Sequence, residues 1–146
     1  QTDEDLVEDL IYLQELRPEM VGIGPFIPHP NTPLGQFPAG SLEKTITLVA
    51  ITRLLLPDAL IPATTALGAL DPFGRERALR AGANVLMPNL SPPEVRPKYA
   101  LYQGKICTDE DAVHCRYCIE RRIQHAGYEL SLERGDHLNF AQTVHQ

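Results

Sequence analysis

The sequence predicts an α/β fold with parallel strands, and two observations support this prediction. Short apolar runs recur at 20–23, 60–65 and 83–87, and helix-like segments separate them. Alternation of this kind is typical of βαβ units, in which a helix crosses over between parallel strands. The runs lack polar alternation, as expected for strands that are covered by helices on both faces.

Four helices are expected from the periodicity of the apolar residues. The first, over 2–16, carries leucines at three- and four-residue spacing and begins at Thr2, a favourable N-cap residue. The others span 41–55, 74–81 and 111–126. Residues 66–72 are mostly small and predict a loop. The arginines of 74–81 are expected on the solvent face of their helix: Arg75, Arg77 and Arg80.

The number of βα units limits the architecture. Three units are too few for a closed barrel of eight, which takes about 250 residues. The chain therefore forms a small open sheet or is the C-terminal part of a (β/α)8 TIM-type barrel, and its abrupt start in a helix favours the second. Residues 1–90 would be the partial barrel, and 91–146 a C-terminal helical extension that carries the cysteines.

The carboxyl ends of parallel strands share one edge of a sheet, which is where α/β proteins place their sites. The apolar loop Pro25, Phe26 and Ile27 follows the first run, and Thr64 with Thr65 ends the second. Threonine hydroxyls there can donate to a carboxylate or phosphate, although a strand end that bonds its own loop is the alternative. The loop can equally be a rigid proline-rich connection.

Other side chains near this edge could line a cavity. Met87 ends the third run, although methionine is more often a core residue. Tyr99 and Tyr102 share a face if their segment is helical, and could cover a cavity or pack on the surface. No histidine, carboxylate or other proton carrier stands out as a catalytic residue.

The three cysteines follow the pattern C-x7-C-x2-C at Cys107, Cys115 and Cys118. An odd number within a short stretch is a poor disulfide framework and a better metal pattern. Three thiolates suit an iron–sulfur cluster with one open iron, or zinc with a fourth ligand such as His114. Three ordinary free cysteines are the alternative.

Composition and motifs exclude several classes. A net charge of -6 argues against a nucleic-acid partner and an anionic membrane surface. No apolar run reaches the roughly 18 residues of a membrane span, and no leader is evident, so a cytoplasmic protein is expected. Neither a G-x-G-x-x-G fingerprint nor a P-loop is present.

Three long words of the sequence resemble a known family: VGIGPFIPHPNTPL, IPATTALGAL and AGANVLMPNLSPPEVRPKYALYQGKIC. Together with the cysteine pattern, they resemble the C-terminal half of the HydE family. These are radical S-adenosylmethionine maturases that help to build the [FeFe]-hydrogenase active site. The resemblance implies a (β/α)8 barrel of which this chain supplies the last three strands. It also implies a small sulfur- or iron-containing precursor, S-adenosylmethionine and a [4Fe–4S] cluster as cofactors, and other hydrogenase maturation proteins as possible partners.

The resemblance also assigns roles to individual positions. Met20 and the loop of Pro25, Phe26 and Ile27 match the wall near S-adenosylmethionine. Thr64 and Thr65 match the anchors of a carboxylate-bearing substrate or anion. Further cavity lining is implied for Met87, Tyr99 and Tyr102. The accessory iron–sulfur cluster of the family is implied at Cys107, Cys115 and Cys118.

The sequence departs from the family at one essential motif. The C-x3-C-x2-C segment that holds the radical-generating cluster is absent, as are the first strands of the barrel. We therefore expect the chain alone to be inactive and to need the missing N-terminal half. A non-catalytic module that binds an iron–sulfur cluster or zinc and acts by interaction is the alternative.

Overall fold

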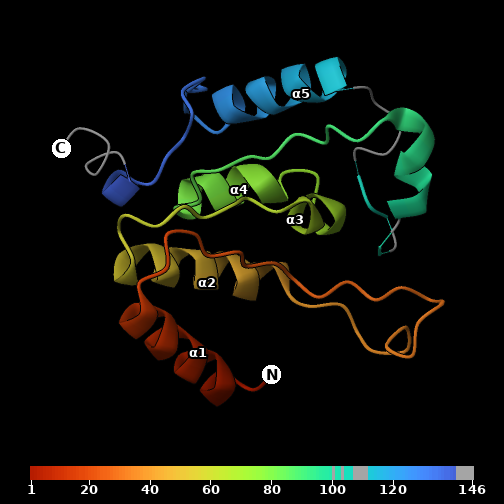
Figure 1. The fold of residues 1–146 in the computed structure, drawn as a ribbon. Coiled ribbons are helices and arrows are strands. Elements are labelled where there is room, and N and C mark those ends of the chain that lie inside the picture. The colour runs from red at the N-terminus through yellow and green to blue at the C-terminus, as the bar shows by residue number, and fades with distance from the viewer. Residues whose placement is uncertain (100, 103, 107–111, 141–146) are drawn as a thin grey trace.

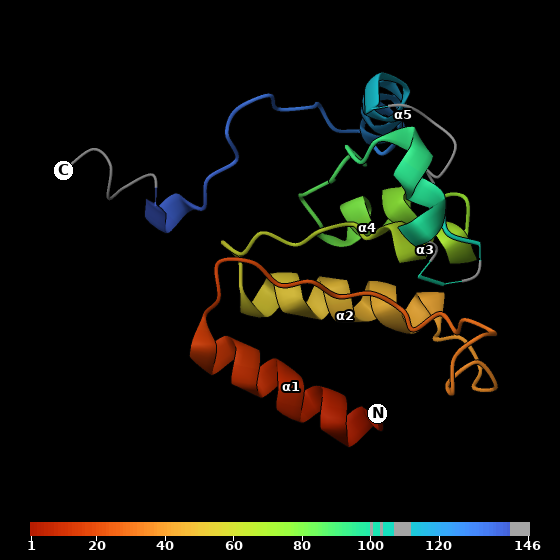
Figure 2. The same ribbon diagram turned by 45° about the vertical axis from the view of Figure 1, so that its right-hand side comes forward.

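Helices dominate the computed structural model, which describes residues 1–99, 101–102, 104–106 and 112–140. The helices are α1 (Asp3–Leu16), α2 (Leu42–Leu55), α3 (Thr65–Leu70), α4 (Gly74–Ala81) and α5 (Ala112–His125), with a 3-10 helix η1 at Pro93–Tyr99. In Figure 1, α1, α2, α4 and α5 follow one another across the molecule in chain order, and Figure 2 shows the same order after a turn. The four predicted helices are confirmed in the described residues, whereas the loop predicted over 66–72 is wrong, because α3 occupies most of it.

The three apolar runs lie side by side and run parallel, as predicted. Met20 forms a parallel bridge with Leu60, and Pro62 forms one with Val85. The prediction of regular strands is wrong for the described residues, where the runs are joined by isolated bridges instead of continuous ladders. A physical reason lies in the middle run: Leu60 bonds the first run, and Pro62, two residues on, has no N–H to continue that ladder.

A side chain supplements the backbone bonds at this point. The amide N–H of Ile61 donates to Oδ1 of Asn84 over 2.8 Å, and the amide N–H of Asn84 donates to the carbonyl of Ile61 over 2.9 Å. The two residues thus bind each other in both directions. This reciprocal pair aligns the second and third runs next to Pro62.

The core lies around α4, which packs against α2, α3 and α5. Val49, Ile61, Leu67 and Ala78 are fully buried there. The expectation that the arginines of α4 face solvent is wrong for Arg75, which is only 1% exposed. Arg77 is also partly covered, with 34% of its side chain exposed, whereas Arg80 is exposed as expected.

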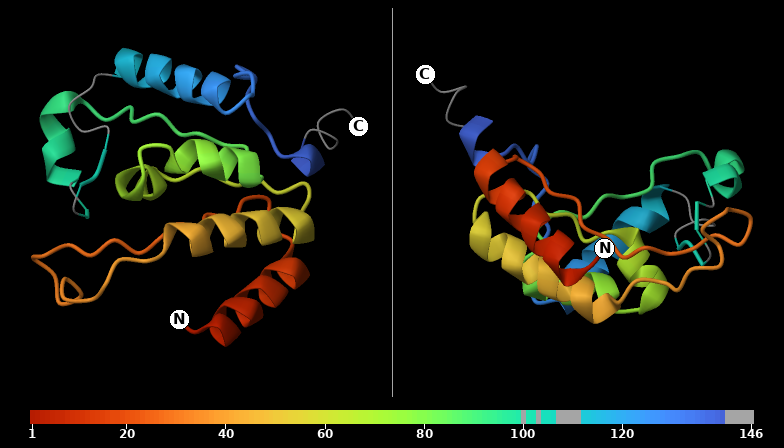
Figure 3. Two further views of the ribbon diagram at one scale, coloured as in Figure 1. Left: turned by 180° about the vertical axis from the view of Figure 1, so that it is seen from behind. Right: turned by 90° about the horizontal axis from the view of Figure 1, so that it is seen from below.

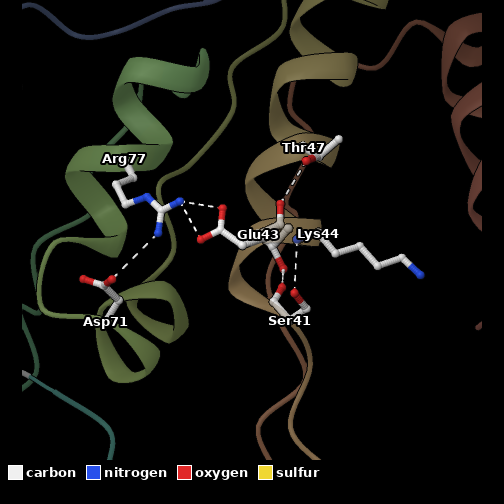
Figure 4. Close-up of polar contacts among 7 residues, drawn as sticks. Ser41, Glu43, Lys44, Thr47, Asp71 and Arg77 are labelled. Atoms are coloured by element: carbon white, nitrogen blue, oxygen red, sulfur yellow. Dashed lines mark hydrogen bonds and ion pairs between the residues drawn. The ribbon is translucent and has the colours of Figure 1, made fainter.

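Arg77 connects α4 to the start of α2. Its Nη2 donates to both carboxylate oxygens of Glu43, over 2.7 and 2.6 Å, and its Nη1 lies 3.8 Å from Asp71 (Figure 4). Hydrogen bonding to Glu43 raises the pKa of Arg77, and burial opposes this rise. Ser41 accepts the amide N–H of Lys44 and so caps the same end of α2. The ion pair therefore fixes the helix that follows the proline-rich loop.

The proline-rich loop between residues 24 and 40 extends away from the helices (Figures 1 and 3). At its base, the amide N–H of Gly40 donates to the carbonyl of Phe26 over 2.7 Å. At its tip, the carbonyl of His29 accepts the hydroxyl of Thr32 over 2.8 Å. These bonds and the prolines give the loop a defined path. No helix in the described part of the chain combines the length and apolarity needed to cross a bilayer.

Candidate functional site at the run ends

Hydroxyl groups from two distant parts of the chain meet at the end of the second run. Oγ1 of Thr65 and the hydroxyl of Tyr102 are 2.9 Å apart and share a hydrogen bond. The first run ends beside them: a Cβ built on Gly24 would lie 3.1 Å from Oγ1 of Thr64. The structure thus brings together both predicted threonines, one predicted tyrosine and the residue before the apolar loop. We call Gly24, Thr64, Thr65 and Tyr102 the hydroxyl cluster.

Within the hydroxyl cluster, Thr64 carries a polar atom without a partner. Its Oγ1 is buried and makes no hydrogen bond in the described part of the chain. Thr64 is the N-cap of α3, yet its side chain makes no capping bond. A buried hydroxyl left unsatisfied costs about 1–3 kcal/mol. A ligand that offers an acceptor at this edge would remove that cost.

Four of the other six predicted site residues are exposed. Exposed fractions are 48% for Met20, 43% for Phe26, 58% for Met87 and 55% for Tyr99. Pro25 and Ile27 are half-buried at the base of the loop. The cavity-lining roles of these six residues stay predictions.

Met20 also lines a groove of about 530 Å³ between α1 and the first run. Its walls are mostly apolar, with Leu10 and Leu13 from α1, Ile23 from the run and Leu48 from α2. The leucines of α1 at 6, 10 and 13 that face it are only half-buried, Tyr12 and Leu16 are exposed, and α1 has no fully buried residue. The groove is therefore a mostly apolar surface that the described residues leave open.

The cysteine site is described in part. Cys115 and Cys118 lie three residues apart on α5, and Cys107 lies outside the described residues. Cys115 is buried, and its Sγ accepts the amide N–H of Asn89 over 3.3 Å. Cys118 is half-buried and is a free thiol like Cys115. No three side chains of histidine, cysteine, aspartate or glutamate gather among the residues that the structure describes.

An arginine that the sequence reasoning did not single out lies on the same helix. Nη1 of Arg122 donates to Oε1 of Glu76 over 2.8 Å and to the carbonyl of Pro72 over 2.9 Å. Burial acts to lower the pKa of Arg122, but Cys118 and Glu76 together raise it. The spacing of Cys118 and Arg122, four residues apart on a predicted helix, was the available signal, because such residues share a face.

The two thiols have chemistry suited to a metal. Thiolate sulfur is the ligand that iron–sulfur clusters and structural zinc prefer. Hydrogen bonds to ligand sulfurs are part of such sites, and Cys115 already accepts one from a backbone amide. Cys115 and Cys118 therefore suit two positions of the predicted accessory cluster.

Parallel runs with crossover helices are the pattern of the α/β class, in which ligand sites lie at the carboxyl ends of the strands. No protein-family model matches the chain. Comparison with curated proteins is more specific. The chain is 49% identical over 144 residues to the [FeFe] hydrogenase maturase subunit HydE of Thermotoga maritima. The match covers 99% of this chain and 41% of the relative, so the resemblance inferred from the sequence is confirmed.

Two further relatives match a smaller part of the chain. The 3-methylornithine synthase of Methanosarcina acetivorans is 35% identical over 83 residues, which is 57% of this chain and 23% of that protein. The enzyme of the same name from Methanosarcina barkeri is 36% identical over 75 residues, or 51% and 21% of the two chains. The chain spans about two fifths of the length of the maturase and less of the synthases.

Proposed function

We propose that the chain is the C-terminal portion of a radical S-adenosylmethionine maturase that helps to assemble the [FeFe]-hydrogenase active-site cofactor. The observation that carries this proposal is the 49% identity to HydE over 99% of the chain. The synthases share lower identity over little more than half of it, which favours the maturase role. The chemistry would come from S-adenosylmethionine and a [4Fe–4S] cluster, whose ligands this chain does not contain.

The proposed architecture is part of a (β/α)8 barrel over residues 1–90, followed by a cysteine-bearing extension over 91–146. Three parallel runs with crossover helices support it. The surface area supports it as well. The chain exposes 9778 Å², whereas a compact monomer of 16.2 kDa would expose about 7,500 Å². Surface in such excess is expected where the remaining strands and helices of a barrel would pack.

The hydroxyl cluster is the proposed anchor of a small anionic or carboxylate-bearing precursor. Thr64 supports this role because its hydroxyl is buried and can still donate a hydrogen bond. Thr65 and Tyr102 share one hydrogen bond, in which only one of the two hydroxyls donates, so the O–H of the other can still donate to a ligand. The S-adenosylmethionine wall would be Met20, Pro25, Phe26 and Ile27. Met87 and Tyr99 would line the rest of the cavity.

The cysteine site is proposed to hold an accessory metal centre. Cys107, Cys115 and Cys118 would be its ligands, and an iron–sulfur cluster is the form that the family resemblance favours. Thiol chemistry and the amide donor to Cys115 support metal binding without choosing between iron and zinc.

A chimera tests the function. The residues of the Thermotoga maturase that this chain matches are replaced by this chain, and the product is reconstituted anaerobically with iron and sulfide. We expect it to form 5′-deoxyadenosine from S-adenosylmethionine and to activate hydrogenase in cells that lack their own maturase. The isolated chain with S-adenosylmethionine and reductant should form none. A chimera that folds and holds its cluster but does neither would contradict the proposal.

Thr64→Val in the chimera tests the anchor. Loss of one hydrogen bond to a charged acceptor is worth about 1.5–3 kcal/mol, so precursor affinity should fall at least tenfold. Thr47→Val is the matched control, because that exposed threonine bonds only the carbonyl of Glu43 within its own helix. Hydrogenase activation that survives Thr64→Val unchanged at limiting precursor would remove the hydroxyl cluster from the function. A purely metal-binding module would hold metal yet fail in every chimera assay.

A further inference from the structure

Arg122 is fixed between two helices on the face of α5 that carries the cysteines. Its guanidinium donates to the carboxylate of Glu76 and to the carbonyl of Pro72, both in or next to α4. The side chain of Glu76 is 4% exposed and that of Arg122 is 25% exposed, so the pair is largely shielded from water. A guanidinium held by two acceptors has a defined position.

Cys118 lies one helical turn before Arg122, and Cys115 lies three residues before Cys118. Residues four apart on a helix are neighbours on one face. Burial acts to lower the pKa of Arg122, and hydrogen bonding and charge from Cys118 help to raise it, so the two side chains interact. The sulfur of Cys115 accepts the amide N–H of Asn89. Donors of this kind orient ligand sulfurs and offset their charge once a metal is bound.

We propose that Arg122 is a positioning residue for a thiophilic metal bound by Cys115 and Cys118. Its guanidinium, fixed by Glu76 and the carbonyl of Pro72, offsets the negative charge of the Cys118 sulfur. It also holds that sulfur on the face of α5 that Cys115 shares. This role rests on the proposed metal function of the cysteines and adds the residue that tunes them.

Cobalt titration of the whole chain tests the role. Co²⁺ bound by thiolates gives a charge-transfer band in the near ultraviolet, and its growth reports affinity. We expect Arg122→Gln to weaken Co²⁺ binding about tenfold or more, as loss of an outer-shell partner does. Arg122→Lys should restore part of that loss because it keeps the charge. Arg121→Gln is the matched control, because Arg121 is an exposed arginine on the same helix.

Circular dichroism of each variant separates folding from metal binding. If Arg122→Gln fails to fold, Glu76→Gln replaces it, because that variant keeps the arginine and weakens the contact that fixes it. Affinity equal to wild type in the folded variant would overturn the role of Arg122 alone. A wild-type chain that shows no thiolate band would overturn the metal site itself, and the two failures are thereby distinguished.

Discussion

At some positions, the residue type is determined by how closely the backbone of another segment approaches. A Cβ on Gly74, the first residue of α4, would lie 2.2 Å from the carbonyl oxygen of Leu67. A backbone atom at this distance cannot move aside as a flexible side chain can. The approach lets α3 turn directly into α4, which carries the core. Glycine is therefore required here by space.

Gly74→Ala tests this requirement. We expect it to lower the free energy of unfolding by about 1–3 kcal/mol, the usual cost of overpacking, as measured by urea denaturation. Gly22→Ala is the control, because a Cβ on Gly22 would meet nothing within 4 Å. Equal midpoints for the two variants would mean that α3 and α4 separate without cost.

Element α1 is held by its cap and by one ion pair, because its apolar face is only half-buried. Oγ1 of Thr2 accepts the amide N–H of Asp5 over 3.2 Å, and Oδ2 of Asp5 accepts the amide N–H of Thr2 over 2.6 Å. Hydrogen bonds from the backbone and side chain of Thr2 lower the pKa of the Asp5 carboxyl, and Lys44 lowers the pKa of Asp3 by a hydrogen bond and by its charge. Both carboxylates therefore favour the folded helix only when they are ionised.

The stability of α1 should consequently depend on pH in a defined direction. A pKa lowered by folding gives stability that is present above the ordinary aspartate value of about 4 and is lost as pH falls through the lower folded value. We expect the amide protection of α1 in hydrogen exchange to hold from pH 7 to about 4 and to decrease below it. Asp5→Asn should flatten this decrease, since the asparagine does not titrate. An unchanged pH profile in that variant would exclude the cap as its cause.

Periodicity and caps made the elements predictable to different degrees. The helix expected over 74–81 has the bounds of α4, because Gly82 ends the apolar pattern sharply. Helix α3 was missed because its six residues are too few to show a period. The prediction of regular strands was wrong, because Pro62 has no N–H with which to continue the pairing with the first run. The burial of Arg75 was not predictable, since charge in the sequence does not reveal what packs over it.

The residues of the candidate site were also predictable to different degrees. Thr64 and Thr65 were found because parallel runs must end at one edge. Tyr102 was proposed, but its hydrogen bond to Thr65 depends on the path of the chain after η1, which no local pattern encodes. Arg122 was missed because its role depends on Glu76, which lies on another helix.

At the scale of the whole molecule, the chain exposes about 30% more surface than a compact monomer of its mass. Large apolar side chains are exposed, including Val7, Ile11 and Leu16 on α1 and Phe37 on the proline-rich loop. Extended apolar surface of this kind marks interaction sites. It is consistent with the proposal that further barrel elements cover it.

Dye binding tests whether further barrel elements cover the exposed apolar surface. Purified chain should enhance the fluorescence of the apolar dye ANS strongly, and the chimera should enhance it less per mole although it is larger. The expected reason is that the added residues pack over the groove beside α1. Equal or greater enhancement by the chimera, with its cooperative unfolding confirmed, would mean that this apolar surface stays open in the longer protein.

Asn84 has a structural role in the apolar run ANVLM that hydropathy does not reveal. By hydropathy alone, the asparagine is a polar residue that interrupts an apolar segment. It in fact fixes that segment to the second run, because its side-chain oxygen accepts the amide N–H of Ile61 and its own backbone N–H donates to the carbonyl of Ile61. One short side chain thus adds to the backbone bonds that align the second and third runs, among them the bond from the amide N–H of Ala63 to the carbonyl of Val85.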